Sequence, residues 1–207
     1  MKLAILRHGQ TDFNVEHRYT GTTDVPLNET GRAEARAAGA APWVGLVFTS
    51  PLRRARETAA ICFPHAAQRP MRDLQEMRFG RWQGHNREEL AGDAAFDAWY
   101  ASGWALRAPG GESRGDQETR VVAALERIVA ETEAAHGSLA VAAAHGGVVM
   151  ATCDALLSEE EKAGRGFHDW RPKNASLTVF DVGRNPQGGL ALSHVRTIDR
   201  TADLATC

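Results

Sequence analysis

The chain is poor in cysteine, nearly balanced in charge and free of long apolar runs, and each of these features excludes a class of protein. Its three cysteines, Cys62, Cys153 and Cys207, stand far apart without a CxxC pair, so they indicate neither a disulfide framework nor a zinc cluster. The formal net charge of −2 provides no overall field for nucleic acid or an anionic membrane. No apolar run approaches the roughly 18 residues of a membrane span. We therefore expect no nucleic-acid partner and no membrane partner.

Motifs for nucleotides and metals are also missing. The fingerprints GxxxxGK[ST] and GxGxxG do not occur, and neither does HExxH or a carboxylate cluster that would hold a metal. Only four apolar residues separate Lys2 from Arg7, too few for the core of a secretory signal. This pattern predicts a cytoplasmic enzyme or binding domain.

What is present is a regular alternation of strand and helix signals. The chain has 207 residues, 43% of them hydrophobic and 24% charged, which is typical of a soluble globular domain. Short apolar runs, typical of strands buried on both faces, occupy residues 3–6, 46–48 and 139–144. Further strands are expected near residues 68–72, 176–181 and 190–195, the last two joined by a hairpin. Helices are expected over residues 30–38, 52–62, 116–136 and 146–157, with a broken helix over 86–104.

The alternation predicts an α/β fold, a three-layer sandwich with a mostly parallel central sheet. Thr30 is the expected N-cap of the first helix. Residues 12–29 have no helical period and are expected to form a long ordered loop, and the tail after about Val195 carries no readable pattern. No linker or repeat divides the chain, so we interpret residues 1–207 as a single domain with a small helical cap at about 85–113.

Polar residues follow three of the predicted strands at their carboxyl ends. These segments are Arg7-His8-Gly9-Gln10-Thr11, Ser50-Pro51-Leu52-Arg53-Arg54-Ala55 and His145-Gly146-Gly147. Because the carboxyl ends of parallel strands form the ligand crevice of an open sheet, the segments predict a local positive pocket. Arginine offers paired donors to phosphoryl oxygens, and a neutral imidazole can attack phosphorus. The pocket is therefore suited to a phosphate dianion, and its arginines are expected to keep His8 neutral near pH 7.

Each of these residues has a plainer interpretation when it is taken alone. A histidine after a strand is more often a hydrogen-bonded structural residue, and Arg7 or Arg54 alone fits a surface ion pair. Glycines after both histidines favour a site because they let a ligand approach the backbone closely. For the five bulky aromatic residues downstream, packing of a small cap is the main interpretation, and an apolar leaving-group pocket is the alternative. These five are Trp82, Phe96, Trp99, Tyr100 and Trp104.

Taken together, the motifs resemble the histidine phosphatase superfamily, which includes the cofactor-dependent phosphoglycerate mutases. The resemblance covers about residues 3–180, with the motifs in the family's order. It rests on Arg7 to Asn14 followed by Gly21, Asp24, Pro26, Leu27 and Gly31, on Ser50 to Ala59, on Glu76 with Phe79 to Gly84, on Pro109 to Ser113, and on His145 to Gly147.

The resemblance implies a role for each matching residue. His8 corresponds to the nucleophile that becomes phosphohistidine, and Glu76 to the general acid that protonates the leaving alkoxide and then activates water. Four residues correspond to phosphate-binding positions: Arg7, Asn14, Arg54 and His145. Thr20 and Gly21 match a loop near the substrate. The residue pattern alone leaves Asp73, Glu88 and Glu89 as rivals of Glu76.

Two positions mark where this chain stands within the family. Gln10 occupies a place where many members have glutamate, which we expect to alter the tuning of the site without abolishing activity. Gly146 follows His145 directly, whereas the acid-phosphatase and phytase branch has aspartate there, so the chain resembles the mutase-like branch. The resemblance implies no metal and no other cofactor, because arginine and histidine supply the positive charge.

The segment between Glu76 and Pro109 is shorter than in the mutases and looks more like that of phosphatase members. We therefore expect a metal-independent phosphomonoesterase that acts on a small phosphorylated metabolite, with alpha-ribazole 5′-phosphate as the leading named substrate. A cofactor-dependent phosphoglycerate mutase, a phosphoprotein phosphatase and a non-catalytic phospholigand-binding protein remain alternatives. A monomer or a homodimer is expected.

Overall fold

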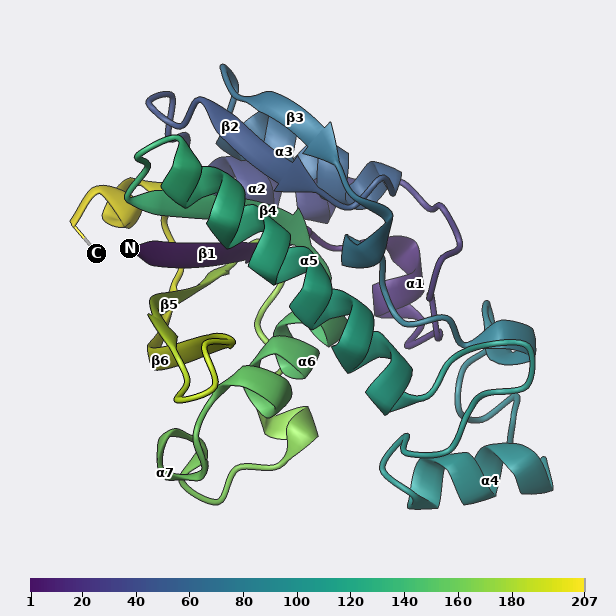
Figure 1. Ribbon diagram of the computed structural model, residues 1–207. Helices are drawn as coiled ribbons and strands as arrows, with labels where there is room; N and C mark the ends of the chain where they lie inside the picture. Colours follow the sequence, from purple (N-terminus) through teal and green to yellow (C-terminus); the bar gives the residue numbers. More distant parts are fainter. Residues whose placement is uncertain (207) are drawn as a thin grey trace.

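The computed structural model describes residues 1–206, and Cys207 lies outside the described residues. A six-stranded sheet with the order β3-β2-β4-β1-β5-β6 forms the middle of the molecule (Figure 1). Its strands are β1 (Lys2–Arg7), β2 (Leu46–Thr49), β3 (Ala67–Pro70), β4 (Leu139–Ala144), β5 (Leu177–Arg184) and β6 (Leu190–Ile198). The first four strands are parallel, while β5 runs antiparallel to both β1 and β6. The predicted mostly parallel sheet is confirmed.

Helices cover both faces of this sheet. The α-helices are α1 (Asp12–Val15), α2 (Glu29–Ala38), α3 (Arg53–Cys62), α4 (Ala94–Ala101), α5 (Arg114–Ala134), α6 (Gly146–Leu156) and α7 (Glu159–Lys162). Short 3-10 turns occupy Arg72–Leu74, Gly80–Trp82, Phe167–Trp170 and Thr201–Thr206. Within residues 1–206, no helix combines the length and the apolar character that crossing a bilayer requires.

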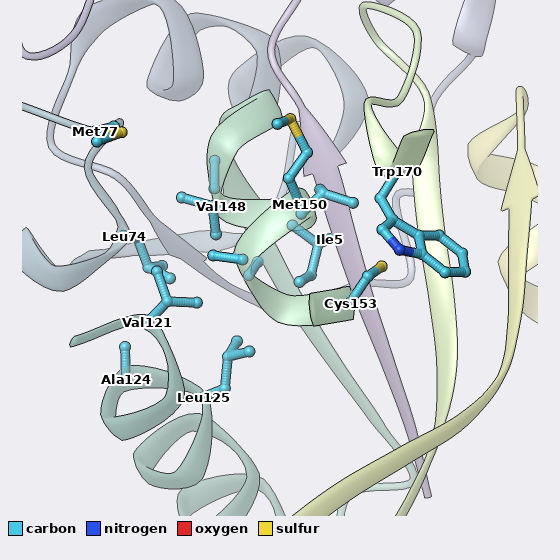
Figure 2. Packing of buried hydrophobic residues seen from close by; sticks show 14 of the residues in the cluster. Ile5, Leu74, Met77, Val121, Ala124, Leu125, Val148, Met150, Cys153 and Trp170 are labelled. Carbon is cyan, nitrogen blue, oxygen red and sulfur yellow. The ribbon is translucent and has the colours of Figure 1, made fainter. Parts of the chain in front are cut away.

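Alternate residues of β1 divide the interior into two apolar cores. Leu3 and Ile5 pack in one core with α5 and α6, and Figure 2 shows Ile5 in the same cluster as Val148 and Met150 of α6. Ala4 and Leu6 pack in the other core with the small residues of α2 and α3. A strand buried on both faces in this way must be apolar throughout, as residues 3–6 are. The predicted three-layer sandwich is therefore confirmed.

The helix boundaries differ from the expected ones where more than one capping residue was available. Helix α2 begins at Glu29, because the Asn28 side chain accepts a hydrogen bond from the Gly31 N–H; Asn28, not Thr30, is the N-cap. Helix α5 begins at Arg114, where Ser113 and Asp116 form a reciprocal capping box. The expected loop over 12–29 contains the one-turn helix α1. The tail is also more regular than expected, since β6 continues to Ile198 before the last 3-10 turn.

The segment between the Gly80–Trp82 turn and α5 carries α4 away from the sheet, at the lower right of Figure 1. Only Ala94–Ala101 is helical there, because Asp93 caps the helix and Gly92 and Gly103 adopt positive φ values at its two ends. Buried aromatic rings fill the segment, and Trp99 stacks on Trp104 at 5.0 Å between centroids. The burial of Trp82, Phe96, Trp99 and Trp104 agrees with packing, the main interpretation of these aromatic residues. The single domain and the cap limits at 85–113 remain predictions.

Candidate active site

A cavity of about 610 Å³ opens at the carboxyl ends of β1 and β4. Strand register places the site there: Arg7 pairs with Ala144, and the N–H of His8 donates to the Ala144 carbonyl oxygen at 3.1 Å. The N–H of Ser50 donates to the carbonyl oxygen of Ala143 at 2.8 Å. Three parallel strands therefore end side by side with their polar residues adjacent. The predicted site residues that line the cavity are Arg7, His8, Asn14, Thr20, Gly21, Arg54 and Glu76.

His8 is oriented by its own neighbour in the chain. Its Nδ1 lies 2.7 Å from the carbonyl oxygen of Gly9, which can only accept, so Nδ1 carries the proton and Nε2 keeps its lone pair. The ring is 5% exposed. Burial lowers the pKa of His8 well below its usual value, and the charges of Arg54 and Arg7 lower it further. The imidazole is therefore neutral at pH 7, mainly because it is buried and secondly because two arginine charges lie nearby.

His145 stands beside His8 but does not line the cavity. The two ring centroids are 5.2 Å apart, and the His145 side chain is fully buried. Its Nε2 lies 2.8 Å from Ser50 Oγ, while its Nδ1 has no hydrogen-bond partner within residues 1–206. Burial is the largest cause that lowers its pKa, followed by the charge of Arg54. Nδ1 is thus the ring atom left for a further interaction.

Arg54 joins the cavity to the loop that follows α1. Its guanidinium is fully buried and donates to the carbonyl oxygens of Thr23 and Gly21, each at 2.8 Å. Its Nε has no partner within the described residues. Burial lowers the pKa of Arg54 to about 10, which still leaves it charged at pH 7. Arg53, the neighbour that the motif passes over, is exposed and pairs with Glu57 at 3.7 Å.

Arg7, which precedes His8 in the chain, is the second arginine of the site and is half-buried. It donates to the carbonyl oxygen of Pro172, and burial lowers its pKa to about 10, with a further contribution from the charge of Arg171. Its Nε is also buried without a partner in the part of the chain that the structure describes. Two charged guanidinium groups with unsatisfied N–H donors thus lie near one neutral imidazole.

Two asparagines form the next part of the wall. The Asn14 Oδ1 accepts from the Thr11 N–H at 3.0 Å, which leaves its amide hydrogens for the cavity. Asn174, just before β5, donates from Nδ2 to the His8 carbonyl oxygen at 3.0 Å. Sequence reasoning missed Asn174, although a signal existed. An antiparallel β5 starts at the edge where the parallel strands end, so residues just before it also reach the site.

Glu76 is held by three N–H donors. Its Oε1 accepts from the Met77 N–H at 2.8 Å and from Gln117 Nε2 at 3.3 Å, and its Oε2 accepts from the Gly147 N–H at 3.1 Å. The sequence left three rival carboxylates, and the structure places them elsewhere. Asp73 pairs with Arg127, Glu89 pairs with Arg18, and Glu88 is exposed, and none of them lines the cavity.

The loop at Thr20 and Gly21 reaches the cavity as expected, and Gly21 has a backbone reason to be glycine. Its φ is +52°, and a Cβ there would lie 2.3 Å from Gln83 Oε1. Thr20 is nearly buried, and its hydroxyl donates to the Arg18 carbonyl oxygen at 3.4 Å. Their hydrogen bonds are with the protein itself, so their part in substrate binding remains a prediction.

The rest of the cavity lining combines aromatic rings with positive charge. Trp104 lines it, and His168 lies edge-on to that ring at 4.6 Å. The guanidinium of Arg87 lies over the ring of Tyr100 at 4.3 Å, and Arg171 is exposed on the opposite segment. The sequence singled out Trp104 and Tyr100 as lining candidates but missed Arg87, His168 and Arg171, which belong to no motif.

No group of three or more histidine, cysteine, aspartate or glutamate side chains within residues 1–206 is arranged to hold a metal ion. Cys62 and Cys153 are free and buried, and burial raises the pKa of each thiol to about 12. The positive groups at the site are therefore its arginines.

Comparison with known proteins places this geometry in a family. The model of the histidine phosphatase superfamily (branch 1) matches residues 3–192. A 2,3-bisphosphoglycerate-dependent phosphoglycerate mutase 2 from Gloeobacter violaceus is 39% identical over 161 residues, 72% of each chain. A glucosyl-3-phosphoglycerate phosphatase from Mycobacterium tuberculosis is 37% identical over 171 residues, 75% of each chain.

Solved structures agree with the sequence relatives. A mycobacterial glucosyl-3-phosphoglycerate phosphatase in complex with VO3 superposes with a TM-score of 0.74 at 30% identity, over 95% of this chain and 96% of that one. A phosphoglycerate mutase from Thermus thermophilus superposes with a TM-score of 0.69 at 31% identity, over 95% of this chain and 100% of that one. The chain belongs to the histidine phosphatase superfamily, as an enzyme of the phosphatase class.

Proposed function

We propose that the protein hydrolyses a phosphomonoester of a small metabolite through a phosphohistidine at His8, without a metal ion. The observation that supports this most directly is the neutral, oriented imidazole close to two charged guanidinium groups. His8 Nε2 forms a bond to phosphorus as the bond from phosphorus to the leaving oxygen breaks. Arg7, Arg54, Asn14 and His145 Nδ1 bind the phosphoryl oxygens and stabilise the charge of the transition state.

Glu76 serves both halves of this reaction. Its carboxyl group donates a proton to the departing oxygen, and the resulting carboxylate then takes a proton from an attacking water. That water forms the new bond to phosphorus, the bond between phosphorus and His8 breaks, and inorganic phosphate leaves. Glu76 ends the cycle protonated, and His8 ends it neutral. Arg7 and Arg54 supply the positive charge throughout.

The rest of the cavity lining supports a substrate whose leaving group carries an acidic group. Arg87 and Arg171 add two guanidinium groups to the lining of the cavity, and Trp104 provides an apolar wall. A phosphorylated hydroxy acid would fit this combination, in keeping with the name of the mycobacterial relative, glucosyl-3-phosphoglycerate phosphatase. Alpha-ribazole 5′-phosphate, the leading named substrate of the sequence analysis, becomes the second candidate, and its aromatic base would pack on Trp104 and Tyr100.

Transfer to a second substrate is the alternative to hydrolysis, because a relative at 39% identity is named a phosphoglycerate mutase. A mutase must keep water from its phosphohistidine and be primed by a bisphosphate. The two activities separate in one assay: 3-phosphoglycerate with its bisphosphate primer gives the 2-phospho isomer in a mutase and free phosphate in a phosphatase. We propose that free phosphate is the main product. A phosphoprotein phosphatase would instead release phosphate from a phosphohistidine or phosphotyrosine peptide.

The decisive test measures phosphate release from p-nitrophenyl phosphate by the purified chain in EDTA, beside His8→Ala. We expect activity that survives EDTA and falls at least about 10³-fold in the variant, as removal of a covalent nucleophile requires. Rapid quenching in alkali should trap phosphate on the wild type alone. His65→Ala, an exposed histidine away from the cavity, is the matched control and should keep full activity. Retained turnover in His8→Ala would refute the covalent mechanism.

A cytoplasmic location, the absence of a nucleic-acid partner and a monomeric or homodimeric state belong to the same proposal. They follow from the sequence arguments on charge and composition. Gel filtration of the purified chain would distinguish the two oligomeric states.

A further inference from the structure

One buried side chain next to Glu76 belongs to none of the sequence motifs. Gln117 lies in the second turn of α5 and is fully buried. Its Nε2 donates to Glu76 Oε1 at 3.3 Å, whereas its own Oε1 has no hydrogen-bond partner within residues 1–206. The neighbours of Gln117 on the same face of α5, Val121 and Leu125, are apolar core residues (Figure 2).

A buried amide with an unsatisfied oxygen is costly for stability. An apolar side chain of similar volume would avoid the desolvation of that oxygen and would continue the core face of α5. Packing alone therefore gives no reason for glutamine at this position. The hydrogen bond from Gln117 to Glu76 provides such a reason.

The backbone of α6 leaves room for this contact. A Cβ at Gly147 would lie 2.1 Å from Glu76 Oε1 and 2.9 Å from Gln117 Nε2. The absence of a side chain at Gly147 therefore allows the carboxylate and the amide to meet. The same glycine donates its N–H to the other carboxylate oxygen.

We infer that Gln117 is a positioning residue that keeps the Glu76 carboxyl group in place in both of its protonation states; this rests on the acid and base roles proposed for Glu76. When Glu76 is a carboxylate, Gln117 donates from Nε2. When Glu76 is protonated, rotation of the amide by half a turn presents Oε1, which accepts the carboxyl O–H. The backbone N–H groups of Met77 and Gly147 can only donate, so of these three groups only the amide serves both forms.

The test compares Gln117→Met with the wild type on an alkyl and an aryl phosphate. Methionine keeps the length of the side chain and removes both hydrogen-bonding functions. We expect kcat/KM for glycerol phosphate to fall about tenfold and kcat/KM for p-nitrophenyl phosphate to change less than twofold, because nitrophenolate leaves without a proton. Competitive inhibition by inorganic phosphate should be unchanged, since the phosphate-binding groups remain.

Two further variants make the result decisive. Val121→Ala, one turn along the same buried face, tests a purely structural effect and should lower thermal stability without separating the two substrates. Glu76→Gln, run in parallel, tests the acid role itself. Equal losses of kcat/KM on both substrates in Gln117→Met, or no loss, would overturn the positioning role. The proposed function would still stand if Glu76→Gln lost more activity on the alkyl phosphate than on the aryl phosphate. No separation in Glu76→Gln would overturn both.

Discussion

His8 and His145 are neutral imidazoles among charged arginines, and their burial is the first cause. Both rings are almost entirely removed from solvent, so the positive charge of a protonated imidazole would be poorly hydrated there. The nearby guanidinium groups add to the effect. A nucleophile that is neutral before substrate arrives needs no proton removed at the moment of attack. The arginines can then remain charged and bind the phosphate.

At Glu76 we predict a dependence on the leaving group. Replacement by glutamine removes the transferable proton but keeps the size of the side chain. We expect kcat/KM for glycerol phosphate to fall about 10²- to 10⁴-fold, the usual contribution of general acid catalysis, and for p-nitrophenyl phosphate to fall much less. Steady-state kinetics on both substrates measure this, with Glu88→Gln as an exposed control. Equal slowing on both substrates would remove Glu76 from the acid role.

The sequence could identify the motif residues because each stands directly at a strand end or in a matched motif. It could select Arg54 over Arg53 by its place in the motif, and burial separates the two in the structure. It could not identify Ser50, Asn174 or Gln117 as neighbours of His145, His8 and Glu76. The contacts of Ser50 and Gln117 depend on strand register and on the rotation of α5, which no local pattern encodes, whereas that of Asn174 follows from the antiparallel direction of β5.

At the scale of elements, the predicted strands and long helices were largely correct, and the errors lie where local signals compete. Continuous apolar runs identified β1, β2 and β4 because buried parallel strands have no polar alternative. The helix starts were misplaced because residues 28–30 and 113–116 each contain several good capping residues. The expected helix over 86–104 was too long, since apolar aromatic residues there pack in turns as well as in α4.

The contact between α5 and α6 contains a carboxylate whose protonation should affect stability. Glu118 lies near Asp154 and Arg114, and burial together with the neighbouring Asp154 raises its pKa to about 7. The unfolded chain releases this proton near pH 4.5, so stability is full below that pH and is lost as the pH rises through about 7.

We therefore predict that Glu118→Gln raises the free energy of unfolding above that of the wild type, and does so more at pH 8 than at pH 5. The neutral amide avoids the charge beside Asp154, and Arg114 keeps Asp154 as a partner. We expect a gain of about 1 kcal/mol at pH 8, after allowance for solvent screening of a half-buried group. Urea denaturation at both pH values measures the difference. Glu126→Gln, exposed on the same helix, should show no pH-dependent gain.

At the scale of the whole molecule, the order of motifs along the chain carried the family resemblance, while the alternation of strands and helices predicted the overall fold. What the order did not supply was the direction of β5. Its antiparallel run beside β1 brings residues 171–176 to the site, and with them Asn174 and Arg171. A sheet read as parallel throughout would place that segment at the opposite edge.

We predict that global stability falls as the pH drops below about 6.5. The unfolded chain protonates His8 and His145 near that pH, whereas the folded protein keeps both neutral, so acidification favours unfolding. Glu118 acts in the opposite direction over part of this range, whereas His168, whose pKa burial also lowers, adds to the effect. Each proton of net difference gives a slope of about 1.4 kcal/mol per pH unit. Urea midpoints at pH 5, 6 and 7 measure the slope, and His8→Ala should make it shallower. An unchanged slope in His8→Ala would contradict the assignment.

The place of β1 in the sheet also decides when the protein can first become active during its synthesis. β1 leads directly into His8, yet both of its neighbours come from the second half of the chain, β4 beginning at Leu139 and β5 at Leu177. A nascent chain holds this strand without either partner until those residues have left the ribosome. Because long-range pairings wait for both strands, the strand made first is among the last to be secured. A fragment that ends before Leu139 lacks the strand that would hold His8 in position.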